Sequence, residues 1–151
     1  MVATDESTLA SVLAAYGESD RFYHTLQHLA ECLDLFEEGV GLADRPGEVA
    51  IALWFHDVVY DTRRSDNESR SADQAEQVLL KAGGSEEEAG RVRQLILATR
   101  HAELPPPGDA ALIVDIDLAI LGAPPERFEE YEIQIHREYE WVPELVFRPT
   151  R

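Results

Sequence analysis

VAIALWFHDVVY, residues 49–60, carries the strongest structural signal in the sequence. Its first seven residues are all apolar, so a helix here has no polar face and is typical of a segment buried on every side. We therefore expect a central helix from Val49 to Tyr60. His56 and Asp57 interrupt the apolar run, and burying an imidazole beside a carboxylate is costly unless a partner compensates both. A divalent cation would compensate both; a plain hydrogen bond between the two side chains is the alternative.

The segments around this stretch have the apolar period of amphipathic helices. Four of them are residues 9–16, 26–36, 72–82 and 128–139. Another helix is expected to start at the capping box formed by Ser85 and Glu88. Residues 112–121 alternate acidic and apolar positions as a strand does, but no other segment could pair with them, so we expect a helix there too. The chain is thus expected to be one all-α domain over residues 1–151, a bundle of six or seven helices.

The composition is that of an ordinary globular domain, with 44% hydrophobic and 28% charged residues in a chain of 151. Lys and Arg number 13 against 30 Asp and Glu, which gives a net charge of −17. This charge argues against a nucleic acid polymer or an anionic membrane as a partner. The single cysteine, Cys32, rules out an internal disulfide, and the acidic first residues do not resemble a signal peptide. We therefore expect a cytoplasmic protein.

Asp115 and Asp117 form an Asp-x-Asp pair inside the apolar segment 112–121. On a helix, the residues three and four positions away from each acid are apolar, so neither is expected to reach a polar face. Two carboxylates in such surroundings need a cation or strong donors, or one of them stays protonated. The alternative is a helix that begins near Asp115, which would then act as its cap.

His24 and His28 form an H-x-x-x-H pair, which places both imidazoles on one face of a helix, a common arrangement for two metal ligands. The metalloprotease pattern requires Glu directly after the first His, and Thr25 stands there instead. His28 lies beside Leu26 and Leu29 on the apolar side of the expected helix, whereas His24 lies at the helix start near Tyr23. We expect His28 to be a ligand and His24 to line the pocket.

These residues resemble the H…HD…D signature of the HD-domain superfamily of metal-dependent phosphohydrolases. The match consists of His28, the doublet His56-Asp57, and a distant Asp within Asp115-Ile116-Asp117. Over residues 9–147 the chain further resembles a bacterial subgroup, the predicted metal-dependent HD-superfamily phosphohydrolases. That similarity rests on short motifs around Tyr23-His24, Trp54-Phe55, Tyr60, Asn67-Glu68, Ser71-Ala72, Ile96, Thr99, His101 and Leu118 to Gly122. The resemblance implies one HD-like helical domain, whose C-terminal part is expected to be shortened because members generally continue further.

The resemblance also implies a ligand set for one divalent ion: His28, His56, Asp57 and Asp117, with Asp115 as the alternative to Asp117. Two neutral imidazoles and two carboxylates balance a 2+ charge, and mixed N and O donors suit Mn, Fe, Co, Ni, Zn or Mg. The implied activity is hydrolysis of a small phosphorylated substrate, a nucleotide or another phosphoester, with a metal-bound water as nucleophile. Asp57 would hold that water.

Outer residues complete the expected site. Glu68 is a candidate general acid or base, and His101 a candidate proton shuttle or ligand of a second metal. Each has an ordinary alternative, since Glu68 suits the first turn of a helix and His101 suits a helix C-terminus. Substrate contacts are expected from residues near these segments: Tyr23, His24, Arg63, Asn67 and Arg100. The run His136, Arg137 and Glu138 is expected to lie on a charged surface.

Two other classes of function remain open at this point. One is a non-catalytic HD-like domain that binds metal or nucleotide for regulation, without turnover. The other is a metal-free helical interaction module, in which the acidic charge and a surface of Tyr131, Tyr139 and Trp141 recognise a basic protein. We favour the enzyme, with a small phosphorylated molecule as its partner; the oligomeric state, a homodimer included, is left open.

Overall fold

The computed structural model describes residues 6–147 of the chain. Within that range every regular element is helical and no strand occurs, which confirms the all-α prediction. Eight α-helices and two 3-10 helices follow one another: α1 (Glu6–Tyr16), α2 (Leu26–Gly39), η1 (Val40–Leu42), α3 (Pro46–Phe55), α4 (Asn67–Lys81), α5 (Glu86–Ala98), α6 (Asp109–Asp117), η2 (Leu118–Gly122), α7 (Pro125–Glu138) and α8 (Glu144–Phe147).

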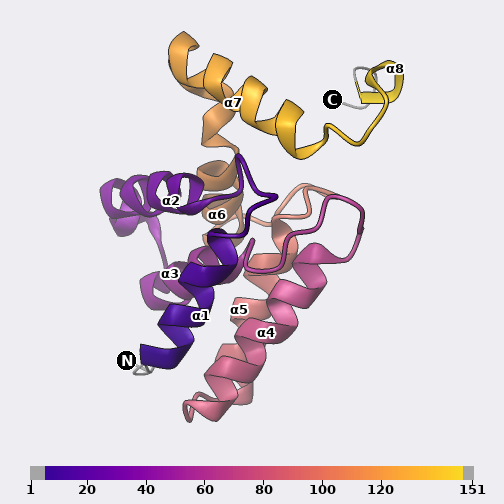
Figure 1. Ribbon diagram of the computed structural model, residues 1–151. Helices are drawn as coiled ribbons and strands as arrows, with labels where there is room; N and C mark the ends of the chain where they lie inside the picture. The colour runs from indigo at the N-terminus through magenta and orange to yellow at the C-terminus, as the bar shows by residue number, and fades with distance from the viewer. Residues whose placement is uncertain (1–5, 148–151) are drawn as a thin grey trace.

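Helix α3 lies at the centre of the fold, as its apolar sequence predicts. It packs against α2, α4, α5 and α6, and Val49, Ala52 and Leu53 are completely buried. Helices α4 and α5 lie side by side as an antiparallel pair, while α7 crosses the opposite end of the molecule (Figure 1). Full burial of a large aliphatic side chain contributes roughly 1.5–3 kcal/mol, so the contacts of α3 are a main source of stability.

Helix α3 is shorter than expected: it ends at Phe55 and does not continue to Tyr60. The chain leaves the helix because side chains from other elements bind its next backbone groups. Arg21, which precedes α2, donates to the carbonyl oxygens of Asp57 (2.6 Å) and Val58 (3.0 Å). These tertiary hydrogen bonds replace helical ones, and they place Asp57 in a turn just beyond the helix end.

Local signals in the sequence set several other boundaries correctly. The Ser85 hydroxyl caps α5 by accepting a hydrogen bond from the Glu88 amide (3.1 Å). Pro125 is the first residue of α7, where its missing N–H costs nothing. Residues 112–121 are helical as predicted, but they are divided between α6 and η2.

The C-terminal helices form a small second core at the end of the bundle. It consists of the buried residues Tyr23, Ile135 and Phe147, with partly buried apolar residues packed around them. Tyr23 precedes α2, whereas Ile135 and Phe147 lie on α7 and α8. This core therefore attaches the C-terminal helices to the loop that leads into α2.

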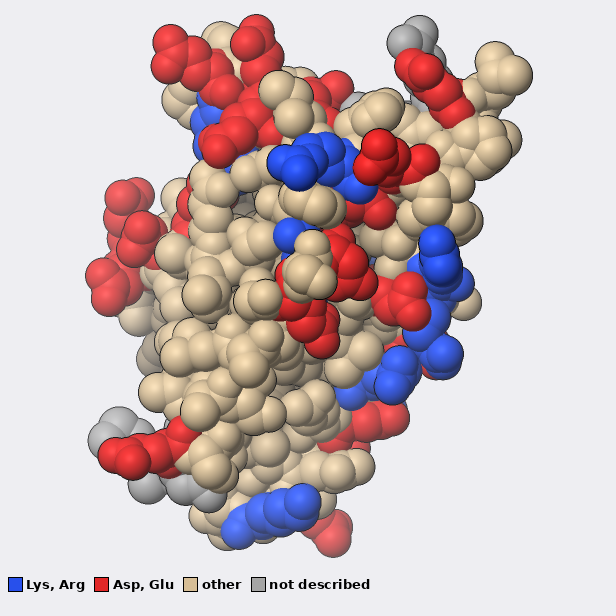
Figure 2. All heavy atoms as spheres, in the orientation of Figure 1, with Lys and Arg blue, Asp and Glu red and all other residues tan. Residues whose placement is uncertain are grey.

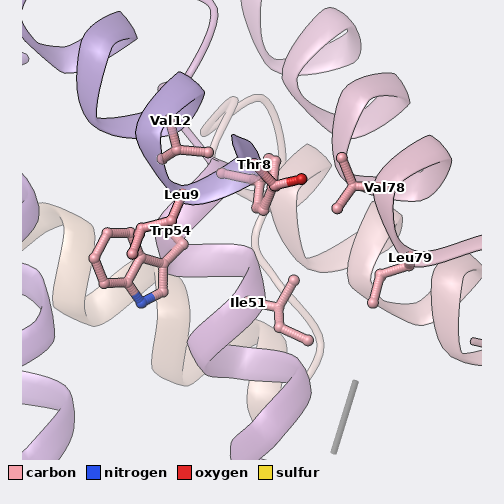
Figure 3. Close-up of a pocket in the computed structure, with 8 residues that line it drawn as sticks. Thr8, Leu9, Val12, Ile51, Trp54, Val78 and Leu79 are labelled. Atoms are coloured by element: carbon pink, nitrogen blue, oxygen red, sulfur yellow. The ribbon is translucent and has the colours of Figure 1, made fainter. Parts of the chain in front are cut away.

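An apolar cavity of about 230 Å³ lies between α1, α3 and α4 (Figure 3). Leu9, Ile51, Trp54 and Val78 are among the side chains that line it. It contains neither the histidines nor the acidic residues singled out in the sequence, so it is a packing gap away from the candidate chemistry.

The molecular surface reflects the acidic composition. In Figure 2, Asp and Glu side chains appear in several separate groups, whereas Lys and Arg gather mainly along one edge of the face shown. A broad uncharged area covers the remainder of that face. None of the described helices combines the length and the apolar character needed to cross a bilayer.

Candidate metal centre

Four side chains converge where α2 passes the ends of α3 and α6, and we call them the His–Asp cluster: His28, His56, Asp57 and Asp117. Nε2 of His28 lies 3.2 Å from Nε2 of His56. It lies 3.4 Å from Oδ2 of Asp57 and 3.2 Å from Oδ1 of Asp117. Nε2 of His56 lies 3.0 Å and 3.5 Å from the same two oxygens.

These spacings are those of ligands around one ion. Donor atoms about 2.1 Å from a common metal lie about 3.0 Å apart at a right angle and about 3.4 Å apart at the tetrahedral angle. The two Nε2 atoms lie 3.2 Å from each other, and each lies 3.0–3.5 Å from the oxygens of Asp57 and Asp117. The two imidazoles and two carboxylates also balance a divalent charge. The residues present therefore fit a divalent ion.

Cys32 is a further buried donor next to the cluster. Its sulfur belongs to a group, with His28, His56 and Asp117, whose potential ligand atoms lie within 4.8 Å of one another. However, Sγ is 3.8 Å from both ring nitrogens of His28, so it lies beside the ring and away from the lone pair of Nε2. The oxygen of Asp57 therefore fits the fourth position better than this sulfur.

The position of His56 follows from the end of α3. Its Nδ1 lies 2.7 Å from the carbonyl oxygen of Leu53, one turn earlier in the helix. A carbonyl can only accept, so Nδ1 carries a proton and Nε2 is the ring atom directed at the cluster. Such an outer hydrogen bond is the usual means of orienting a histidine ligand.

The turn that holds Asp57 is fixed by two buried residues from the N-terminal part of the chain. The Tyr16 hydroxyl accepts from the Asp57 amide (3.4 Å) and donates to the Trp54 carbonyl (3.2 Å). Burial raises the pKa of Tyr16 to about 12, so this hydroxyl keeps its proton. Arg21 binds the Asp57 carbonyl from the other side. The carboxylate of Asp57 thus needs no movement to face the imidazoles.

Asp117 uses both of its oxygens. Oδ1 faces His28 and His56, whereas Oδ2 lies 2.8 Å from Nε2 of His101. Asp117 is the last residue of α6, and its side chain is only 14% exposed. Asp115 is exposed on the opposite side of that helix, so the expectation that both acids lack a polar face is wrong for Asp115. Asp117 is therefore the better placed of the two candidates.

Opposing effects set the proton affinities of the side chains in the His–Asp cluster. Burial alone would lower the pKa of His28, but hydrogen bonds with Asp117 and Asp57 raise it well above its ordinary value. Burial alone would raise the pKa of Asp117, but its bonds with His101 and His28 hold it well below its ordinary value. A cation must therefore displace protons from the imidazoles, as is general for histidine sites.

His24 lies before α2 and not on it, because Thr25 caps that helix. Its Nδ1 is 2.8 Å from Oε2 of Glu138, whose side chain is completely buried. Oε1 of Glu138 accepts hydrogen bonds from three successive backbone amides, those of residues 22, 23 and 24, at 2.7–2.8 Å. The expected surface position of Glu138 is therefore wrong: it anchors the loop that presents His24.

The other residues predicted for the site make contacts outside the His–Asp cluster. Glu68 is in the first turn of α4 and is one of the charges that raise the pKa of His101, after the larger effect of Asp117. Both polar atoms of the Asn67 side chain bond the backbone of Asp61, so Asn67 holds the loop after α3. Arg63 lies over the Trp141 ring at 5.2 Å, and Arg100 is exposed. Their substrate contacts stay predictions.

Sequence reasoning missed three residues of the site: Cys32, Glu138 and Arg21. Cys32 carried a usable signal, since it follows His28 by four positions on the apolar side of one helix. Glu138 carried no such signal, because it ends a charged run that resembles solvent-exposed sequence.

Comparison of the chain with family models, curated proteins and solved structures finds no match.

Proposed function

We propose that the chain is a metal-dependent phosphohydrolase of the HD-domain type, acting on a small phosphorylated substrate such as a nucleotide or another phosphoester. The observation that carries this proposal is the spacing of 3.0–3.5 Å between the two Nε2 atoms of His28 and His56, and between each of them and the oxygens of Asp57 and Asp117. A divalent ion bound there acts as a Lewis acid on a phosphate oxygen and lowers the pKa of a coordinated water. The sequence resemblance supports the same assignment by analogy.

The side chains of this protein would divide the remaining work. His28, His56, Asp57 and Asp117 hold the ion. His101 is bound to the outer oxygen of Asp117 and its side chain is one-third exposed, so it can pass a proton between the site and a departing alcohol. Glu68 is a second candidate for this step.

His24 is suited to orient the substrate at the edge of the cluster. Glu138 accepts the proton on Nδ1, so Nε2 of His24 is left to bind a ligand. The ring stacks on Tyr60 with centroids 3.8 Å apart, which fixes its plane. We also propose a reducing, cytoplasmic setting, because Cys32 is a buried free thiol.

The first experiment is elemental analysis of the untagged protein beside a His56→Ala/Asp57→Ala double variant. The matched control is Asp115→Ala/His136→Ala, which removes an exposed residue of each type. We expect about one divalent metal per chain in the wild type and the control, and none in the cluster variant. The loaded protein is then assayed for release of phosphate from a panel of phosphoesters.

Two results would contradict the proposal. Absence of metal, even after incubation with Mn, Fe, Co, Ni, Zn or Mg in turn, would leave the cluster a hydrogen-bonded core. Bound metal without hydrolysis of any phosphoester would reject the hydrolase and point to a domain that binds its ligand without turnover.

A further inference from the structure

A second cavity, of about 450 Å³, opens directly beside the His–Asp cluster. Asp117 and His101 form the part of its wall nearest the cluster. The rest is built from the loop before α2, from η2 and from the C-terminal helices. Tyr60, from the loop after α3, also lines it, and its other aromatic residues are Tyr23, Tyr131, Tyr139 and Phe147. Its volume lies within the range of small-molecule sites.

The aromatic walls are held in place by contacts with one another. Tyr131 meets the Tyr23 ring edge-on, with centroids 4.7 Å apart. Tyr60 stacks on His24, and its hydroxyl lies 3.0 Å from that of Tyr139. Rings fixed in this way form a preorganised surface, which lowers the entropic cost of binding a flat ligand.

The cavity offers no cation to a charged organic group. Among the described residues that line it, none is Lys or Arg. Each of its two imidazoles, those of His24 and His101, is paired through one ring nitrogen with a carboxylate, that of Glu138 or Asp117, so neither pair adds a net positive charge. An additional anionic group would enter a desolvated space without a partner, which is costly. A ligand that fits is therefore uncharged apart from its phosphate.

The mouth of the cavity indicates an occupant with an apolar part. Leu118 and Leu121 line the cavity while 37% and 58% exposed, so apolar surface faces solvent at its mouth. An apolar organic group placed there would cover this surface, which is favourable.

We propose that this cavity binds the organic group of the substrate and selects a flat, uncharged, aromatic one. This rests on the proposed function, which places the phosphate at the His–Asp cluster. The preferred substrate is then a phosphate ester of an alcohol that carries an aromatic ring and no further charge. Sugar phosphates and organic groups with additional acids are disfavoured.

Binding to the metal-loaded protein, measured by calorimetry, tests this independently of turnover. The probes are 2-phenylethylphosphonate, propylphosphonate and 2-(4-carboxyphenyl)ethylphosphonate, which share one phosphonate and differ only in the organic group. We expect the phenyl probe to bind at least about tenfold more tightly than either of the others. Tyr131→Leu should reduce this preference, and Ile133→Ala, an exposed change on the same helix, should leave it intact.

Leu121→Lys provides a second variant that does not disturb the core. A lysine at the cavity mouth should strengthen binding of the carboxylated probe by about two- to fivefold, the usual effect of an exposed ion pair. Equal affinity for the three probes, or no binding of any, would overturn the inference. Hydrolysis of phosphoesters without preference for aromatic alcohols would overturn it while the proposed function stands. Selective binding without hydrolysis would reject the proposed function alone.

Discussion

His101 binds the outer oxygen of Asp117, with Nε2 2.8 Å from Oδ2, while the inner oxygen of that carboxylate faces His28 and His56. The imidazole therefore fixes the direction in which Asp117 presents its inner oxygen. His101 itself has a positive φ of 53°, which places it in the left-handed region where Asn is tolerated among non-glycine residues.

His101→Asn keeps this backbone conformation but is too short to reach Asp117. We expect the variant still to bind metal, with an affinity lower by about 10- to 100-fold, as is typical when an outer hydrogen bond to a ligand is lost. Competition with a chelator measures the difference. Glu103→Gln, an exposed change nearby, is the control. An unchanged affinity in His101→Asn would mean that Asp117 is oriented by other contacts.

Asp57 and Cys32 are the two candidates for the fourth position around the proposed ion, and their variants separate them. Cys32→Ser should retain about one metal per chain, because the sulfur lies beside the His28 ring. Asp57→Asn should lose most of the metal, because the remaining charge no longer balances the ion. Cobalt-loaded protein supplies an independent readout, since a thiolate ligand adds a strong near-ultraviolet absorption band. That band in the wild type, absent in Cys32→Ser, would contradict the assignment.

Glu138 should make stability depend on pH. Burial alone would raise the pKa of Glu138, but its hydrogen bonds with His24 and the loop amides lower it. A carboxyl with a lower pKa in the folded state stabilises the fold above its unfolded value of about 4.3, and this stabilisation is lost as pH falls through the folded value. Glu138→Gln should therefore unfold on the order of 1–3 kcal/mol more easily at pH 7.

Denaturant unfolding of both proteins at pH 7, 4 and 3 tests this linkage. The difference between wild type and Glu138→Gln should shrink toward acid pH, since protonation removes what the substitution removes. A difference that stays constant across this range would show that Glu138 contributes through packing and not through its charge.

Leu53 links the core to the His–Asp cluster, because its side chain is fully buried and its carbonyl orients His56. Leu53→Ala should lower the free energy of unfolding by about 2–5 kcal/mol through the cavity it leaves. Leu104→Ala makes the same chemical change at a residue that is 96% exposed, and should alter stability by less than about 0.5 kcal/mol. Thermal or denaturant unfolding of the pair measures both values, and equal effects would place Leu53 outside the core.

The sequence predicts the helical class and most helix positions because apolar periodicity and capping are local signals. The length of α3 was not predictable in this way: its end depends on Arg21, which approaches from a distant part of the chain. The same distinction applies to the site. His56 and Asp57 stand out because they interrupt an apolar run, and the structure places both beside His28 and Asp117.

Residues whose role depends on tertiary contact carried no such signal. Asp115 and Asp117 look alike in the sequence, yet helix rotation exposes one and directs the other to the cluster. Glu138 ends a charged run, and only the packing of α7 against the loop before α2 buries it. Burial of a charged residue is decided by its partners, and these lie 114–116 positions away along the chain.

The anchoring of residues 22–24 by Glu138 also orders events during synthesis. The ribosome delivers the chain from its N-terminus, so His24, His28, His56 and Asp117 all emerge before the carboxylate that fixes the loop. A nascent chain can bring the four cluster residues together, but its entrance loop stays without an anchor until α7 is complete. Full assembly of the pocket therefore waits until α7 has emerged from the ribosome.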